Sequence, residues 1–185
     1  MRAAIILAAG ASRRFGSRDK LKAKLADKSL LDHAIVNALA SGAARILLVA
    51  PSSPPKRRVK HIRMKRSDAL STSLRAGLAA LRPIEREVLI FLADMPFARA
   101  PRLRFCPGAD AARPCFRGQP GHPMLVRAAP ARAALGTSDR GLGAALGTAF
   151  VPGTAAHLLD IDTPIALRRA QRHGSRAWRP RSAKD

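Results

Sequence analysis

The sequence predicts an α/β fold, in which helices cover both faces of a mostly parallel β-sheet. Short apolar runs that suit buried strands alternate with segments whose apolar residues recur at helical spacing. The runs at 3–8, 45–50 and 88–93 each contain at most one polar residue, which is typical of strands buried on both faces. We therefore expect one three-layer α/β/α domain over residues 1–174, followed by a basic tail at 175–185.

The first apolar run leads into a loop of small residues at 9–16. Gly10 ends the run, and backbone N–H groups that follow a strand in this way suit phosphate oxygens. Arg13 and Arg14 add forked donors for the same oxygens. The loop lacks the Gly-Lys-Ser/Thr of a Walker motif, and Ser12 stands where a dinucleotide loop has its second glycine. The pattern predicts a nucleotide phosphate loop of another type, with an ordinary strand-to-helix turn as the alternative.

Four further elements are expected between the loop and the most apolar run. Ser29 gives a capping-box-like start to a helix that Gly42 ends. A strand is expected at 45–50 and a short one at 59–64. The next helix is expected at 71–81, where three hydroxyl residues at the entry suit an anion or the edge of a base, or act only as caps.

A carboxylate directly follows the most apolar run. Asp94 comes after 88–93, in a chain with only 12 Asp and Glu residues, and open α/β sheets bind ligands at the carboxyl ends of their strands. A buried carboxylate needs a cation partner, and Mg²⁺ takes one or two carboxylates together with phosphate oxygens. The position predicts a magnesium site at Asp94, with a helix N-cap or a salt bridge to an arginine as the alternative.

Two aspartates near the C-terminus are candidates for the same metal site. A last strand is expected at 156–161, and a Thr-Pro pair suits the start of a helix at 164–172. In strand geometry Asp160 and Asp162 face the same side. Either could complete the metal site, and we favour Asp162 because it lies at the end of the expected strand.

The region between these carboxylates is less regular. Residues 98–120 are rich in proline and show no clear period, and a turn at 118–123 precedes a short strand expected at 124–126. His122 lies in that turn. Its ring has the chemistry to hydrogen-bond a phosphate, and a purely structural role is the alternative.

The composition limits the class of protein. The formal net charge is +22, which suggests nucleic-acid binding. The basic residues, however, are spread over every segment, and only six Phe and one Trp are present to stack on bases. We favour a basic surface that attracts polyanionic substrates and expect no nucleic-acid partner. Two cysteines give no disulfide framework, and no apolar run is long enough to cross a membrane, so we expect a cytoplasmic protein without a membrane partner.

Four blocks, in this order along the chain, resemble the MobA-like nucleotidyltransferases and, more narrowly, the molybdenum cofactor cytidylyltransferases. They are 7–16 (LAAGASRRFG) followed by 19–21 (DKL), then 71–78 (STSLRAGL), 92–96 (LADMP) and 160–164 (DIDTP). The resemblance implies a Rossmann-like nucleotidyltransferase domain that uses Mg²⁺ and an NTP and releases pyrophosphate. One departure is Ser138, which stands where relatives usually carry the first glycine of Gly-Asp-x-Gly.

The resemblance also implies roles for individual residues. The catalytic set is Lys20, Arg14 and Asp94, with Lys24 as a substitute for Lys20. The metal ligands are Asp94 with Asp162 or Asp160. Contacts to the nucleotide or the acceptor are expected from Leu7, Ala8, Ala9, Gly10, Ser12, Arg13, Ser73, Gly77 and His122.

CTP is the favoured nucleotide. Ala9 is similar to the cytidylyl-transferring relatives, whereas guanylyl-transferring relatives tend to have glycine there. The resemblance makes molybdopterin the acceptor and implies a molybdoenzyme or its chaperone as a partner. A GTP-using guanylyltransferase, a transferase for sugar or alcohol phosphates, and a fold that binds nucleotide without catalysis are the alternatives.

Overall fold

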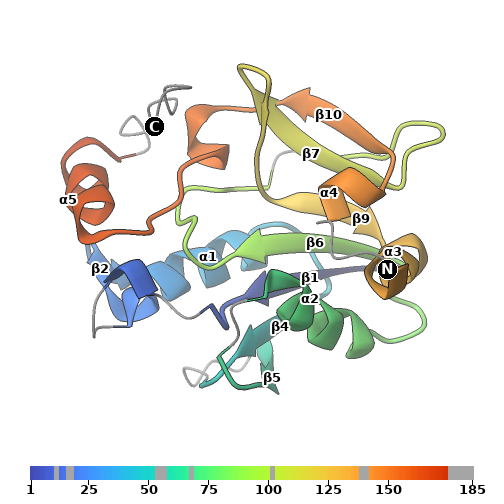
Figure 1. Cartoon of the computed structure of the whole chain (residues 1–185), viewed down its shortest axis with the longest axis horizontal. Helices are drawn as coiled ribbons and strands as arrows, with labels where there is room; N and C mark the ends of the chain where they lie inside the picture. Colours follow the sequence, from blue (N-terminus) through green and yellow to red (C-terminus); the bar gives the residue numbers. More distant parts are fainter. Residues whose placement is uncertain are drawn as a thin grey trace.

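The computed structural model describes residues 1–10, 13–15, 19–52, 58–66, 69–100, 103–137 and 142–174. Its centre is an eight-stranded sheet in the order β10-β7-β9-β6-β1-β4-β5, with β8 paired to β7 (Figure 1). The strands are β1 (Arg2–Leu7), β4 (Arg45–Ala50), β5 (Val59–Arg63), β6 (Glu87–Leu92), β7 (Ala111–Phe116), β8 (Gln119–Pro120), β9 (Met124–Arg127) and β10 (Thr148–Pro152).

A small hairpin and the helices surround this sheet. The hairpin pairs β2 (Lys24–Leu25) with β3 (Lys28–Ser29). The α-helices are α1 (Leu30–Leu39), α2 (Leu70–Ala79), α3 (Ala128–Thr137), α4 (Leu142–Ala145) and α5 (Pro164–His173). The 3-10 helices are η1 (Arg13–Phe15), η2 (Lys20–Lys22) and η3 (Ala155–His157). None of the described helices is long and apolar enough to span a membrane.

The strand directions confirm the expected mostly parallel α/β fold. β5, β4, β1 and β6 run parallel to one another. β9 runs antiparallel to its neighbours β6 and β7, and β10 pairs parallel with β7. The register places Leu7 beside Val49 on one side and Leu92 on the other. The three central strands therefore end at the same edge of the sheet.

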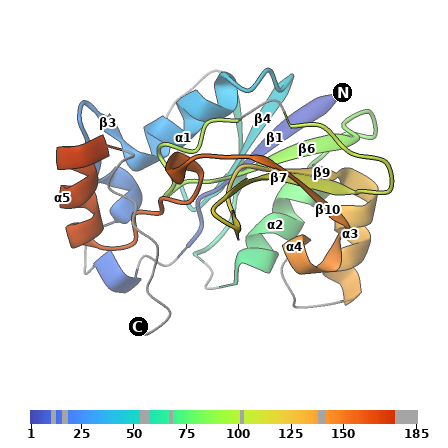
Figure 2. The same ribbon diagram turned by 90° about the horizontal axis from the view of Figure 1, so that it is seen from above.

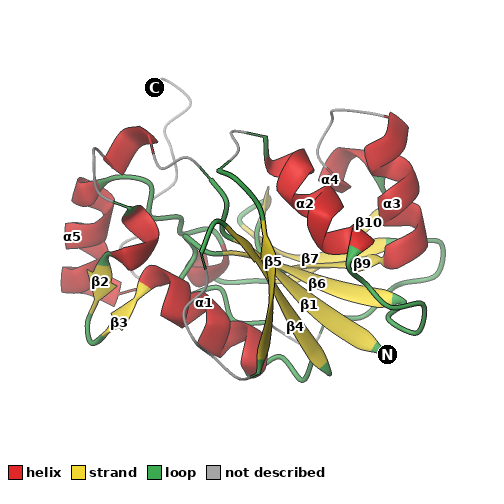
Figure 3. Cartoon of the chain, turned by 90° about the horizontal axis from the view of Figure 1, so that it is seen from below, coloured by secondary structure: helices red, strands yellow, loops and turns green. Residues whose placement is uncertain are grey.

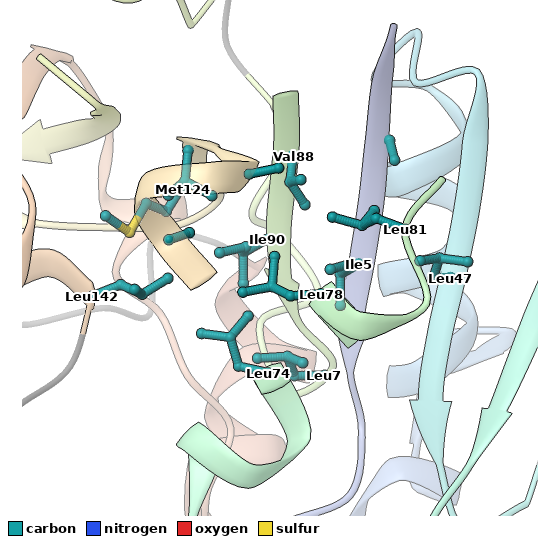
Figure 4. Packing of buried hydrophobic residues seen from close by; sticks show 14 of the residues in the cluster. Ile5, Leu7, Leu47, Leu74, Leu78, Leu81, Val88, Ile90, Met124 and Leu142 are labelled. Atoms are coloured by element: carbon teal, nitrogen blue, oxygen red, sulfur yellow. The ribbon is translucent and has the colours of Figure 1, made fainter. Parts of the chain in front are cut away.

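The alternation of side chains along β1 builds two cores from one apolar run. Ile5 and Leu7 face α2, where they pack with Leu74 and Leu78 (Figure 4). The intervening residues, such as Ile6, face α1 instead. Figure 3 shows α1 on one side of the fanned strands and α2, α3 and α4 on the other. Because successive side chains of a strand point to opposite faces, this alternation produces the three expected layers.

A third apolar cluster holds the C-terminal helix. α5 and the β2–β3 hairpin lie together at the side of the molecule toward which β6 points (Figures 1 and 2). The buried members of this cluster are Phe15, Leu25, Leu30, Leu159, Ile161 and Ala170. They join η1, the hairpin and α5 to the segment just before α5, so that this segment lies against the carboxyl edge of the sheet.

The starts of α1 and α5 follow the expected capping, whereas α2 has Ala69 at its N-cap and no side-chain cap hydrogen bond, so that the hydroxyl residues at 71–73 lie inside its first turn. Ser29 accepts a hydrogen bond from the Asp32 backbone N–H (3.1 Å) and donates its hydroxyl to the Asp32 carboxylate (2.7 Å). At α5, Thr163 accepts from the Ala166 backbone N–H and Pro164 occupies the first turn. Each side chain satisfies an N–H group that the helix leaves free at its start.

Two expectations about strands are wrong. Residues 156–161 are not a strand: they hold part of η3 and an irregular segment, and the preceding strand is β10 at Thr148–Pro152. Leu159 and Ile161 alternate with polar residues because they fill the third cluster, not because they belong to a sheet. The region 98–120 also contains two unforeseen strands, β7 and β8, and β7 includes a proline at position 114.

Gly77 is fixed by packing between α2 and the sheet. A Cβ atom at this position would lie 2.8 Å from Cγ2 of Ile5 and 3.2 Å from Cγ2 of Val49. We therefore expect Gly77→Val to destabilise the protein by about 2 kcal/mol, because overpacking a tight core forces side chains and backbone to shift. Ala79→Val, on the exposed side of the same helix, is the matched control and should change stability by under about 0.5 kcal/mol. Urea denaturation of the two variants measures the difference, and equal effects would contradict a packing role.

Candidate active site

A cavity of about 130 Å³ opens at the carboxyl ends of β1 and β6. Its lining consists of Leu7, Ala8, Ala9, Gly10, Lys20, Leu21, Leu70, Ser73, Leu92, Ala93 and Asp94. The sheet hydrogen bonds continue past the strand ends, since Ala8 donates to the Val49 carbonyl (2.9 Å) and Ala93 donates to the Leu7 carbonyl (3.1 Å). The glycine loop and Asp94 therefore leave the sheet side by side, where α/β folds bind ligands.

Lys20 links the two carboxylates of this site. Its Nζ lies 2.7 Å from Oδ2 of Asp94 and 2.7 Å from Oδ1 of Asp162. Lys20 is only 9% exposed, and it is the first residue of η2, which Asp19 caps by accepting the Leu21 backbone N–H (3.1 Å). An almost buried lysine needs such partners, because an unpaired buried charge is costly.

Asp162 reaches the site through the buried segment before α5. The backbone N–H of Ile161 donates to the Asp94 carbonyl at 2.9 Å, and Ile161 itself is fully buried. These contacts hold the chain so that Asp162 faces Lys20. Arg14, whose side chain is 67% exposed, donates from Nη2 to the other Asp162 oxygen at 2.7 Å. Asp160 is exposed.

The charges at this site reinforce one another. Burial opposes the charged form of Lys20, but the carboxylates of Asp94 and Asp162 outweigh it, and the pKa of Lys20 is raised. Burial likewise disfavours the charged form of Asp162, but the hydrogen bond and charge of Lys20, together with Arg14, hold the pKa of Asp162 below its ordinary value. Lys20 and Asp162 are therefore an ion pair across the neutral pH range.

The donor set fits a divalent cation. Asp94 and Asp162 already converge on one cation, the Lys20 ammonium, at 2.7 Å from each carboxylate. Within the described ranges no group of three or more His, Cys, Asp or Glu residues gathers into a metal site, so protein ligands alone do not complete a cage. Two carboxylates with phosphate oxygens and water as further ligands is the arrangement that Mg²⁺ prefers.

The structure places the other predicted site residues in different parts of the molecule. Leu7 to Gly10 and Ser73 line the cavity, and Ser73 is 3% exposed. Gly77 packs against Ile5 and does not line it. Lys24 lies in β2, with its ammonium 3.4 Å from the Asp27 carbonyl. Ser12, the side chain of Arg13 and the Ser138 turn lie outside the described residues.

His122 lies near Arg113 and Ile90 and is not part of the lining of the cavity at Asp94. Its Nδ1 is fully buried and, among the described residues, has no hydrogen-bond partner. Burial and the positive charge of Arg113 lower the pKa of His122 to about 4, although a backbone hydrogen bond with Ile90 acts in the opposite direction. The imidazole is therefore neutral at pH 7, with one buried nitrogen available to a hydrogen-bonding group.

The buried His122 should make stability depend on pH. Its pKa falls from 6.5 to about 4 on folding, so between these values the unfolded chain binds a proton that the folded protein does not. Stability from this residue is therefore present above pH 6.5 and falls as the pH drops towards 4, by about 2 kcal/mol between pH 7 and pH 5. Urea unfolding of wild type and His122→Gln at both pH values measures the loss. An equal loss in the two proteins would contradict the buried neutral ring.

Several residues of the site region were assigned no role from the sequence. Leu21 and Leu70 line the cavity as ordinary apolar side chains. Arg66 donates to the Gly10 carbonyl and to Asp19, but it lies in a stretch crowded with basic residues, where one arginine does not stand out. A contact between residues so far apart in the chain has no local signal in the sequence.

The sequence matches the family model described as the MobA-like NTP transferase domain over residues 4–152. The search of curated protein sequences gave no significant match. Among solved structures, the fold is similar to 2-C-methyl-D-erythritol 4-phosphate cytidylyltransferase from Thermus thermophilus (TM-score 0.71, 18% identity, 93% of this chain and 98% of that chain). It is also similar to molybdopterin-guanine dinucleotide biosynthesis protein A from Archaeoglobus fulgidus (TM-score 0.66, 17% identity, 94% and 99%). A manganese complex of a protein from Mycobacterium tuberculosis is similar as well (TM-score 0.65, 18% identity, 92% and 97%).

Sequence identities of 17–18% to solved structures support only the fold. The family assignment rests instead on the match of the sequence to the family model. The matched region, 4–152, covers most of the chain and includes the glycine loop, Lys20, Ser73 and Asp94. Asp162 lies just beyond it and is brought back to the same site by the fold. This chain belongs to the MobA-like NTP transferase domain family.

Proposed function

We propose that this nucleotidyltransferase transfers CMP from CTP to the phosphate of molybdopterin and releases pyrophosphate. The observation that carries the proposal is the convergence of Asp94 and Asp162 on the Lys20 ammonium, at the edge of the sheet where the glycine loop begins. A triphosphate brings about four negative charges, and this site offers both cationic side chains and a pair of carboxylates that can hold a metal ion against it.

The reaction needs positioning and charge neutralisation more than covalent chemistry. An oxygen of the acceptor phosphate attacks the α-phosphorus of the NTP, the bond from that phosphorus to the bridging oxygen breaks, and pyrophosphate leaves. Lys20 supplies positive charge beside the α-phosphate. Arg14 and the backbone of the glycine loop bind the leaving pyrophosphate. The Arg14 side chain is 67% exposed and, among the described residues, forms an ion pair only with Asp162; a guanidinium has five N–H donors, so further donors can reach the pyrophosphate.

Asp94 and Asp162 would hold the divalent cation. When bound, Mg²⁺ neutralises charge on the phosphates of the NTP. One structural neighbour is a complex with manganese, which supports the use of a divalent ion in this fold. The protein's own contribution is to orient both carboxylates from rigid supports, Asp94 from the end of β6 and Asp162 from the segment held by Ile161.

The choice of CTP rests on the walls of the cavity. Ala9 is 1% exposed and lines the cavity next to Gly10, and its methyl group reduces the space available to a base. The buried hydroxyl of Ser73 lies in the same lining and is available to contact the base. One structural neighbour is named a cytidylyltransferase and another a molybdopterin-guanine protein, so the neighbours support both nucleotides, and Ala9 favours the pyrimidine.

A pyrophosphate-release screen tests the proposal. CTP, GTP, ATP and UTP are each incubated with Mg²⁺ and with molybdopterin, a sugar phosphate or an alcohol phosphate as acceptor. We expect the fastest release with CTP and molybdopterin. Faster release with GTP would overturn the assigned nucleotide, and release only with a sugar or alcohol phosphate would overturn the acceptor. No release with any combination would reject catalysis by this site.

A further inference from the structure

Arg66 joins the two ends of the loop segment that carries the predicted phosphate contacts. It follows the edge strand β5, and its guanidinium donates from Nη1 to the Gly10 carbonyl at 2.9 Å and from Nη2 to Oδ2 of Asp19 at 2.6 Å. Gly10 and Asp19 flank the segment 11–18, within which the structure describes only η1. One side chain from a distant part of the sequence therefore fixes both points at which this segment begins and ends.

Asp19 connects Arg66 to the start of η2, where Lys20 lies. One of its carboxylate oxygens accepts from Arg66, and the other accepts the Leu21 backbone N–H at 3.1 Å. The Asp19 carbonyl also accepts the Lys22 N–H at 3.1 Å. Asp19 thus sets the direction of η2, whose first residue carries the ammonium between the two site carboxylates.

The contacts of Arg66 are better suited to positioning Gly10 and Asp19 than to stabilising the folded protein. The side chains of Arg66 and Asp19 are 39% and 24% exposed, and ion pairs with this exposure add little to stability. A guanidinium, however, is a planar fork that can bind two separate acceptors in one fixed orientation, which a lysine ammonium does not reproduce. The specific contribution of Arg66 is the fixed spacing of Gly10 and Asp19.

We propose that Arg66 is a positioning residue, which acts through its contacts with Gly10 and Asp19 to hold Gly10 and Lys20 in the arrangement that meets the triphosphate. This inference rests on the proposed nucleotidyl transfer. It assigns Arg66 an effect on the rate of the reaction rather than on the identity of the nucleotide, because Arg66 contacts the loop and its cap and does not line the nucleotide cavity.

The test compares Arg66→Ala and Arg66→Lys with Lys65→Ala, which removes one exposed positive charge from the adjacent position. Both Arg66 variants should lower kcat/KM for the NTP by about 10- to 100-fold, mainly through kcat, because small errors in position are costly in a pre-organised site. Lys65→Ala should stay within about two-fold of wild type, as expected for an exposed surface change. The double variant Asp19→Asn with Arg66→Ala should lose no more than the larger single variant, because the two residues act as one unit.

Amide hydrogen exchange tests the same idea without turnover. The Leu21 and Lys22 amides should exchange faster in both Arg66 variants and at the wild-type rate in Lys65→Ala. Full activity in Arg66→Lys would overturn the inference, because charge alone would then suffice. Unchanged exchange of these amides in Arg66→Ala would overturn it as well. Wild-type protein that releases no pyrophosphate would reject the proposed function, while the exchange data would still decide whether Arg66 orders η2.

Discussion

Asp94→Asn is expected to lower kcat for pyrophosphate release by about 10³-fold, which is typical for the loss of one charge-stabilising group in an active site. The amide keeps the shape of the side chain but removes the negative charge that would help to hold a divalent cation. The fold should survive, because Lys20 keeps its ion pair with Asp162 at 2.7 Å. Steady-state pyrophosphate release at saturating CTP and Mg²⁺ measures the rate, and the thermal midpoint reports on the fold.

The two aspartates of the DIDTP block provide a second test of the metal site and a comparison for it. Asp162→Asn should reduce kcat as strongly as Asp94→Asn, because both carboxylates contact Lys20. Asp160→Asn makes the same chemical change at an exposed position whose side chain hydrogen-bonds Asp162, and it should lower kcat much less than Asp162→Asn, because it is Asp162 that forms the ion pair with Lys20. Full Mg²⁺-dependent release by Asp94→Asn would show that the metal assignment is wrong. A larger loss of kcat in Asp160→Asn than in Asp162→Asn would show that Asp160, rather than Asp162, is the second metal ligand beside Asp94.

Lys20→Met should lower kcat by about 10²-fold while changing the dissociation constant of CTP by less than about ten-fold. The ammonium lies between two carboxylates, and under the proposed function its charge would stabilise the α-phosphate more in the transition state than in the bound nucleotide. Methionine keeps much of the buried length of the side chain. Rapid-quench measurement of the chemical step and calorimetric titration with CTP separate the two effects.

Lys24→Met is the control for a general loss of positive charge in this region. Lys24 is exposed in β2, and its ammonium lies near the Asp27 carbonyl rather than near the site carboxylates. Its loss should leave both kcat and CTP binding close to wild type. A large fall of kcat in Lys24→Met with a wild-type kcat in Lys20→Met would show that Lys24 is the catalytic lysine. The ion pairs of Lys20 with Asp94 and Asp162 would then not be part of catalysis.

Much of the sheet could be predicted because a strand that is buried on both faces appears as a short apolar run in the sequence. The runs at 3–8, 45–50 and 88–93 are apolar on both faces of their strands, and β1, β4 and β6 form there. Asp94 could be identified as a site candidate for a similar reason, since a carboxylate that directly follows such a strand must lie at the edge of the sheet. Ser29 and Thr163 also act locally, as caps of the helices they precede.

The C-terminal segment shows where the local pattern misleads. Leu159 and Ile161 alternate with aspartates in a way that predicts a strand, but both side chains are buried in the cluster with Phe15 and Leu25. The same period of two arises whenever an extended chain lies on an apolar surface, so it does not by itself imply sheet hydrogen bonds. In β7 the local pattern hides a real strand, because an arginine and a proline interrupt its apolar residues.

The sequence by itself determined the strands that end at the site, the glycine loop, and Asp94 and Lys20 as members of the candidate set. Only the tertiary structure decided that Asp162 rather than Asp160 contacts Lys20, that Gly77 serves packing against Ile5, and that Arg66 spans Gly10 and Asp19. The physical reason is that burial and capping depend on neighbouring residues. An ion pair between residues 20 and 162, by contrast, depends on how separate elements pack.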